Sequence, residues 1–198
     1  MIEAELKALV HVPEGMRRRL DALASGRDET YFDTYYDTHD RTLGAKDQEL
    51  RVRTVETAGR TRTLLTFKDT TVDLASGSKP ESETGVEDPE AVHAVLRGLG
   101  YVPSIAFEKR CRNYAFEAKG RRMLATLVRV PELEGTFLEL ETLSDEADLA
   151  AALSDVRALL TELGIDREDV TRELYTDAVR SRRTGDSVHP SWSPRTRG

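Results

Sequence analysis

The stretch Glu3-Ala4-Glu5-Leu6-Lys7 decides the fold, because charged and apolar residues alternate along it without a break. On a β-strand successive side chains point to opposite faces, so both carboxylates and the ammonium group share one face. Ile2, Ala4 and Leu6 supply the apolar opposite face. Two acids beside a lysine suit the lining of a metal and phosphate site. For one such strand alone, a solvated outer surface is the alternative.

The same alternation recurs in later strand-like segments. Like charges two residues apart on an exposed strand are unfavourable, so solvation of a surface does not account for their repetition. We therefore expect the charged faces of several strands to converge on one hollow. The charged residues that share a face within their segments are Arg51 and Arg53; Arg62 and Lys68; Lys79, Glu81 and Glu83; and Glu139 and Glu141. Lys109 shares its face with Cys111, whereas Arg110 points to the other side.

Short connections between these segments predict mostly antiparallel pairing. The fold class is α+β, an eight-stranded antiparallel closed β-barrel with a wet lumen and helices packed outside. An open sheet with one solvated face is the alternative. The predicted strands are 1–10, 30–37, 50–56, 62–68, 81–86, 105–116, 122–130 and 135–143, and the predicted helices are 13–24, 89–100, 145–163 and 166–179. Residues 1–179 form one domain, 69–80 a long loop, and 180–198 a disordered tail.

Composition limits the class of protein. The chain has 198 residues, of which 38% are hydrophobic and 33% charged, with a net charge of −7. This acidic balance argues against a general nucleic-acid binder, which should be basic. The single cysteine, Cys111, rules out an internal disulfide and fits a reducing compartment. No signal peptide or run of 18 apolar residues is present, so we expect a cytoplasmic protein with no membrane partner.

The converging charges predict a specific chemistry. Carboxylate oxygens are the ligands that hard divalent cations such as Mg²⁺ and Mn²⁺ prefer. Lysine and arginine hold phosphate oxygens, and arginine does so with two parallel hydrogen bonds. The acids expected at the metal are Glu3, Glu5, Glu139 and Glu141, and the bases expected at the phosphates are Lys7, Arg51, Arg53, Lys68 and Lys109.

These segments also resemble a known family. The motifs that carry the resemblance are Glu3-x-Glu5-x-Lys7, Tyr35-Tyr36-Asp37-Thr38, Leu50-Arg51-Val52-Arg53, Leu65-Thr66-Phe67-Lys68, Glu81-x-Glu83, Glu108-Lys109-Arg110 and residues 135–141. In this order, over about residues 1–178, they are similar to the CYTH family of triphosphate tunnel metalloenzymes. The resemblance implies an eight-stranded barrel that forms a tunnel.

The resemblance also implies roles for individual residues. Two divalent ions, Mg²⁺ or Mn²⁺, are expected on the acids. The metal-side acids would be Glu3, Glu5, Glu81, Glu83, Glu139 and Glu141. The phosphate-binding bases would be Lys7, Arg51, Arg53, Arg62, Lys68, Lys79, Lys109 and Arg110. Glu3, Glu5, Lys7 and Lys68 would be the catalytic residues among them.

The activity implied first is that of a class IV adenylyl cyclase, a phosphorus–oxygen lyase that converts ATP to cyclic AMP and pyrophosphate. The first alternative is a hydrolase of thiamine triphosphate or inorganic tripolyphosphate, and the second is a non-catalytic binder of nucleotides or polyphosphate. A small triphosphate is the expected partner, and a homodimer is suggested only by analogy.

Two positions depart from the family pattern. Family members usually carry an aspartate shortly before the Gly-x-Phe stretch, where this chain has Val128 or Arg129. They often carry Lys-x-Arg in the sixth strand, where this chain has Lys109-Arg110-Cys111. Weakened metal binding, an altered substrate or a shifted register are the possible meanings.

Overall fold

A computed structural model describes residues 1–185, and the remainder of the predicted tail, 186–198, lies outside the described residues. The strands are β1 Ile2–Leu9, β2 Arg27–Asp37, β3 Glu49–Thr57, β4 Arg60–Lys68, β5 Glu81–Val86, β6 Val102–Ala118, β7 Arg121–Arg129, β8 Phe137–Ser144 and β9 Val170–Thr171. The helices are α1 Pro13–Asp21, α2 Thr42–Ala45, α3 Pro89–Gly98, α4 Leu149–Glu162 and α5 Tyr175–Thr184, with a 3₁₀ turn at Arg167–Asp169.

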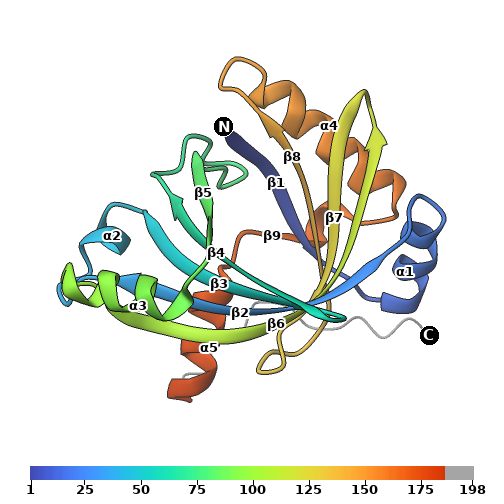
Figure 1. The fold of residues 1–198 in the computed structure, drawn as a ribbon. Coiled ribbons are helices and arrows are strands. Elements are labelled where there is room, and N and C mark those ends of the chain that lie inside the picture. Colours follow the sequence, from blue (N-terminus) through green and yellow to red (C-terminus); the bar gives the residue numbers. More distant parts are fainter. Residues whose placement is uncertain (186–198) are drawn as a thin grey trace.

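The strands of residues 1–185 form one antiparallel sheet in the order β5-β4-β3-β2-β6-β7-β8-β1-β9. The sheet curves strongly, so that β5 returns toward β1 (Figure 1). The α+β class is confirmed, but a closed eight-stranded barrel is not, because the sheet has nine strands and two edges. In place of a strand ladder, the described residues have a bridge between Ile2 and Pro80 and a 3.0 Å hydrogen bond from Glu81 N to the Met1 carbonyl, which connect β1 to the start of β5.

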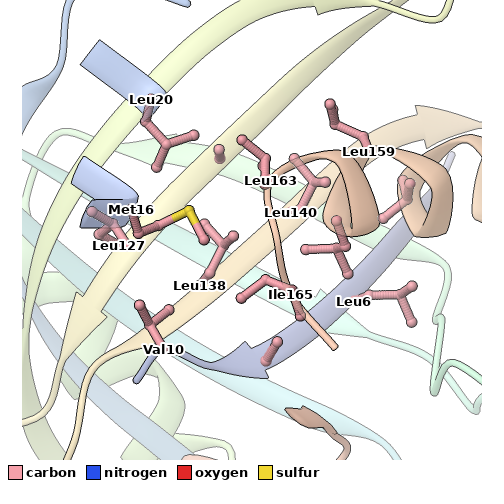
Figure 2. Packing of buried hydrophobic residues seen from close by; sticks show 14 of the residues in the cluster. Leu6, Val10, Met16, Leu20, Leu127, Leu138, Leu140, Leu159, Leu163 and Ile165 are labelled. Atoms are coloured by element: carbon pink, nitrogen blue, oxygen red, sulfur yellow. The ribbon is translucent and has the colours of Figure 1, made fainter. Parts of the chain in front are cut away.

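The alternation in β1 places its two faces as expected. Ile2, Ala4, Leu6 and Ala8 are buried, and the charged residues between them are half-buried. Beyond β1, the apolar faces of β7 and β8 pack against α1 and α4, as Figure 2 shows for Leu138 and Leu140 beside the helix residues. The largest apolar cluster of the described residues therefore lies on the convex side of the sheet, and the concave side carries polar groups beside a second apolar cluster.

A third helix, α3, covers the other half of the convex side. Leu96 of α3 packs with Tyr36, Leu50 and Val52, which come from β2 and β3. Asp88 begins this helix by accepting a 3.0 Å hydrogen bond from the Ala91 backbone N, as expected for an N-cap.

The C-terminal segment differs from the prediction. The helix expected over 166–179 is wrong, because the chain forms a 3₁₀ turn, the short strand β9 and then α5. Val170 and Thr171 pair with Ala8 and Lys7 at the free edge of β1, and these β-branched residues favour the extended state. α5 also continues past Arg180, where the tail was expected to begin. Within residues 1–185 no helix is long and apolar enough to cross a membrane.

Candidate functional site

The concave side of the sheet encloses a cavity of about 330 Å³. Its lining combines acids and bases from β1, β3, β4, β5, β6 and β8, which are far apart in sequence. The predicted residues that line it are Glu3, Glu5, Lys7, Arg51, Arg53, Arg62, Lys68, Lys79, Glu81, Glu83, Lys109, Glu139 and Glu141. Arg110 is outside it, and its Nε donates a 2.7 Å hydrogen bond to Glu108 on the opposite face of β6. The strands and the loop before β5 thus bring together every predicted residue except Arg110.

Three carboxylates gather at one place in this cavity. Glu3, Glu5 and Glu141 each offer an oxygen, and these oxygens lie within 4.8 Å of one another. Glu5 and Glu141 face each other across β1 and β8, and neither has an ion pair among the described residues. Burial and then the charge of Glu139 raise the pKa of Glu5 to about 7, and burial with the charges of Glu3 and Glu5 raises the pKa of Glu141 well above its ordinary value. Negative charge is in excess here, which a cation would relieve.

Two lysines are paired with other acids of the cavity. Lys68 Nζ is 2.6 Å from Glu3 and 3.0 Å from Glu81, and Lys109 Nζ is 3.2 Å from Glu139. Burial lowers the pKa of Lys68, but the charges of the neighbouring acids outweigh this and raise it well above its ordinary value. Both ammonium groups therefore remain charged in the cavity.

The two arginines of β3 differ in what they can offer a ligand. Arg53 Nε and Nη2 donate hydrogen bonds of 2.6 and 2.7 Å to Asp33, and its guanidinium lies 4.4 Å from the centre of the Tyr31 ring. Arg51 Nη2 donates a 3.3 Å hydrogen bond to Thr66, but its buried Nε has no partner among the described residues. Arg51 is therefore the arginine with a free donor.

Two further bases have different surroundings. Lys79 is 8% exposed, and its Nζ donates 2.9 Å hydrogen bonds to carboxylates of Asp47 and Glu49. This lysine is tied to the loop between α2 and β3. Arg62 has a side chain that is 62% exposed and lies 3.5 Å from Glu29, so it occupies the open rim.

The sequence reasoning missed several residues at the site. Asp33 lies opposite Arg53 in the β2–β3 register and shares its face with Tyr31 and Tyr35, so extending the alternation to β2 would have found it. Arg172, which follows β9, and Tyr175, the first residue of α5, also line the cavity. A segment predicted as one continuous helix gave no signal for these two.

The two departures from the family pattern lie side by side. Cys111 and Val128 are paired in the β6–β7 register, and both are buried in an apolar cluster with Tyr31 and Val55. Burial raises the pKa of the Cys111 thiol to about 12, so it stays neutral. Arg129 is exposed, so Val128 is the residue on the inward-facing side.

Comparison with known proteins is consistent with this geometry. The family model described as "CYTH domain" matches residues 1–175. The chain belongs to the CYTH domain family. Membership in the CYTH family implies use of a divalent metal, and the donor set of Glu3, Glu5 and Glu141 fits one, because clustered carboxylate oxygens are the ligands of hard cations.

Three relatives illustrate what this CYTH chain is similar to. "Putative adenylate cyclase MJ0240" of Methanocaldococcus jannaschii is 26% identical over 180 residues, which are 89% of this chain and 98% of that protein. The structure of the PH1819 protein of Pyrococcus horikoshii aligns with a TM-score of 0.78 at 24% identity, covering 91% of this chain and 99% of the other. The "putative adenylyl cyclase HpAC1" of Hippeastrum, described as having a dominant triphosphatase activity, aligns with a TM-score of 0.64 at 16% identity, covering 91% and 95%.

Proposed function

We propose that the chain is a divalent-metal-dependent enzyme that acts on a triphosphate, and that it converts ATP to cyclic AMP and pyrophosphate. The observation that carries the proposal is one cavity in which three clustered carboxylates face five or more buried or half-buried bases. Neither set alone would hold a metal–triphosphate complex, because the acids repel the phosphates and the bases repel the metal ion.

In this proposal the acidic residues bind the metal ion and the basic residues bind the phosphates. Glu3, Glu5 and Glu141 would hold Mg²⁺ or Mn²⁺, with Glu139 close to them. When bound, such an ion neutralises phosphate charge and lowers the pKa of a nearby hydroxyl. Lys68 and the free Nε of Arg51 would contact phosphate oxygens, since both lie in the same lining.

In a cyclase the substrate's own atoms react. A bond forms between the ribose 3′ oxygen and the α-phosphorus, the bond from that phosphorus to the β-bridging oxygen breaks, and the hydroxyl proton passes to water. The bases stabilise the negative charge that develops on the leaving pyrophosphate. A folded triphosphate held at several points would bring the 3′ oxygen and the phosphorus into line.

A triphosphatase is the second candidate, and the description of the Hippeastrum relative favours it. The same acids and bases would hold the triphosphate, but water would attack the terminal phosphorus and release orthophosphate. The two reactions therefore differ in nucleophile and not in the charged lining.

Product analysis separates the candidates. The purified chain is incubated with ATP, thiamine triphosphate and inorganic tripolyphosphate, each with Mg²⁺ and with Mn²⁺, and the products are resolved by chromatography. Cyclic AMP with pyrophosphate supports the cyclase, and orthophosphate supports the hydrolase. Tight binding without any product would reject both enzymes in favour of a non-catalytic binder, which the valine at position 128 would then help to explain.

A further inference from the structure

The segment leading into α5 reaches the cavity from outside the charged strands. Figure 1 places β9 and the chain that follows it between the two halves of the curved sheet. Tyr175, the first residue of α5, lines the cavity although it is only 9% exposed. Its ring meets Phe137 edge-on at a centroid distance of 5.5 Å, and it belongs to the same apolar cluster as Val179. The ring is thus fixed by packing on its apolar side.

Two lysines contact this ring. Lys7 Nζ lies 4.1 Å from the ring centroid and Lys109 Nζ lies 4.6 Å from it. The lysines come from β1 and β6, which β7 and β8 separate in the sheet, so no backbone pairing sets the distance between them. Lys7 Nζ also donates a hydrogen bond to the Glu173 carbonyl, two residues before the ring. One short segment therefore contacts two cations from strands that do not pair with each other.

Holding these cations near one another requires compensation. Lys109 has the carboxylate of Glu139, but Lys7 has no carboxylate partner among the ion pairs of residues 1–185. An ammonium over the face of an aromatic ring is attracted by the negative charge of the π-system, and the attraction strengthens where water is excluded. The Tyr175 ring supplies such a face to both lysines. Its hydroxyl lies near Glu139, so the face of the ring is the part that meets the two ammonium groups.

We propose that Tyr175 is a positioning residue of the triphosphate site, whose ring holds Lys7 and Lys109 where both can contact one phosphate chain. The inference rests on the proposed triphosphate-binding function. The α5 segment then becomes part of the binding site through an aromatic ring, in addition to the Arg172 side chain that lines the cavity.

The test compares three variants by calorimetric binding of inorganic tripolyphosphate with Mg²⁺. Tyr175→Leu removes the ring face, Tyr175→Phe keeps it, and Val179→Ala loosens the packing of α5 in the same cluster without touching the ring. We expect Tyr175→Leu to weaken binding about tenfold or more, as the loss of two cation–π contacts would. Tyr175→Phe and Val179→Ala should each change it by less than about threefold. If Tyr175→Phe and Tyr175→Leu lose the same affinity for tripolyphosphate, the effect belongs to the hydroxyl. If Val179→Ala loses as much affinity as Tyr175→Leu, the effect belongs to the docking of α5. Either result overturns the proposal.

Two further measurements test the proposal if the Tyr175→Leu variant does not fold. Pentafluorophenylalanine at position 175 keeps the shape of the ring and reverses its charge distribution, so it should weaken binding relative to Tyr175→Phe. In the ligand-free protein, the ε-methylene protons of Lys7 and Lys109 should show upfield ring-current shifts in the NMR spectrum. If the ε-methylene protons of both lysines have ordinary chemical shifts, the proposal for Tyr175 is overturned, whether or not tripolyphosphate binds. If the protons show ring-current shifts but tripolyphosphate does not bind, only the proposed function is overturned.

Discussion

Replacing Asp33 by asparagine tests whether the cavity lining is preorganised. Asp33 has a fully buried side chain, and Arg53, its partner in two short hydrogen bonds, is 13% exposed. The substitution keeps the shape but removes the charge, which leaves the guanidinium buried beside a neutral amide. Removing one partner of a buried ion pair lowers the free energy of unfolding by about 3–5 kcal/mol. Because Arg53 also lines the cavity, we expect a loss near the lower end of this range.

The pKa gives a second route to the magnitude. Burial raises the pKa of Asp33, but the charge and hydrogen bonds of Arg53 outweigh this and lower it from 3.8 to about 2. This difference corresponds to roughly 2 kcal/mol of stability. Because the folded-state pKa is depressed, that contribution is fully present above about pH 4 and is lost as the pH falls toward 2. We therefore expect Asp33→Asn to lower the free energy of unfolding by about 2–4 kcal/mol at neutral pH.

Urea unfolding followed by circular dichroism measures this difference. With a slope of about 2 kcal/mol per molar urea, the midpoint should fall by about 1–2 M. Glu108→Gln is the matched control, because its 2.7 Å pair with Arg110 is similar in length but largely exposed, and such pairs contribute less than about 1 kcal/mol. The reasoning is refuted if the two variants lose equal stability at pH 7, or if the Asp33→Asn loss does not shrink between about pH 4 and 2.

Other expectations concern binding and turnover. Glu5→Gln and Glu139→Gln should each reduce metal-dependent turnover by about 100-fold or more while the protein stays folded, and only Glu139→Gln, which breaks the buried pair with Lys109, should lower the urea midpoint; unchanged turnover in both would reject the acidic site. Arg51→Ala should weaken tripolyphosphate binding about tenfold, because its free Nε is lost, whereas Arg110→Ala should leave the dissociation constant unchanged, since its side chain lies outside the cavity. Chelation with EDTA should abolish turnover, and added Mg²⁺ or Mn²⁺ should restore it; full activity in EDTA would contradict metal dependence.

The alternation of charged residues was sufficient to predict most of the charged residues that line the cavity. In β1 the period of two fixes which side chains face the same way, and the structure places Glu3, Glu5 and Lys7 together as that period requires. The same rule places Arg110 on the face opposite Lys109, as the sequence indicates, whereas the family resemblance had included it. Periodicity was the better guide to position here.

What the sequence could not supply was the relation between distant segments. The pairing of Cys111 with Val128 depends on the β6–β7 register, which individual strand patterns do not fix. Only this register shows that both departures from the family pattern fall in one apolar cluster. Likewise, the two edges of the sheet and the docking of Tyr175 depend on how far the sheet curves, and no local pattern encodes that.

The position of the main apolar core has an evolutionary consequence. Because that core lies between the convex side of the sheet and α1 and α4, substitutions on the concave side leave its packing untouched. Selection can then exchange one anion specificity for another through inward-facing residues without disturbing that core, although a buried pair such as Asp33 with Arg53 carries a cost of its own. Such a separation would allow relatives to diverge in chemistry while keeping a common architecture.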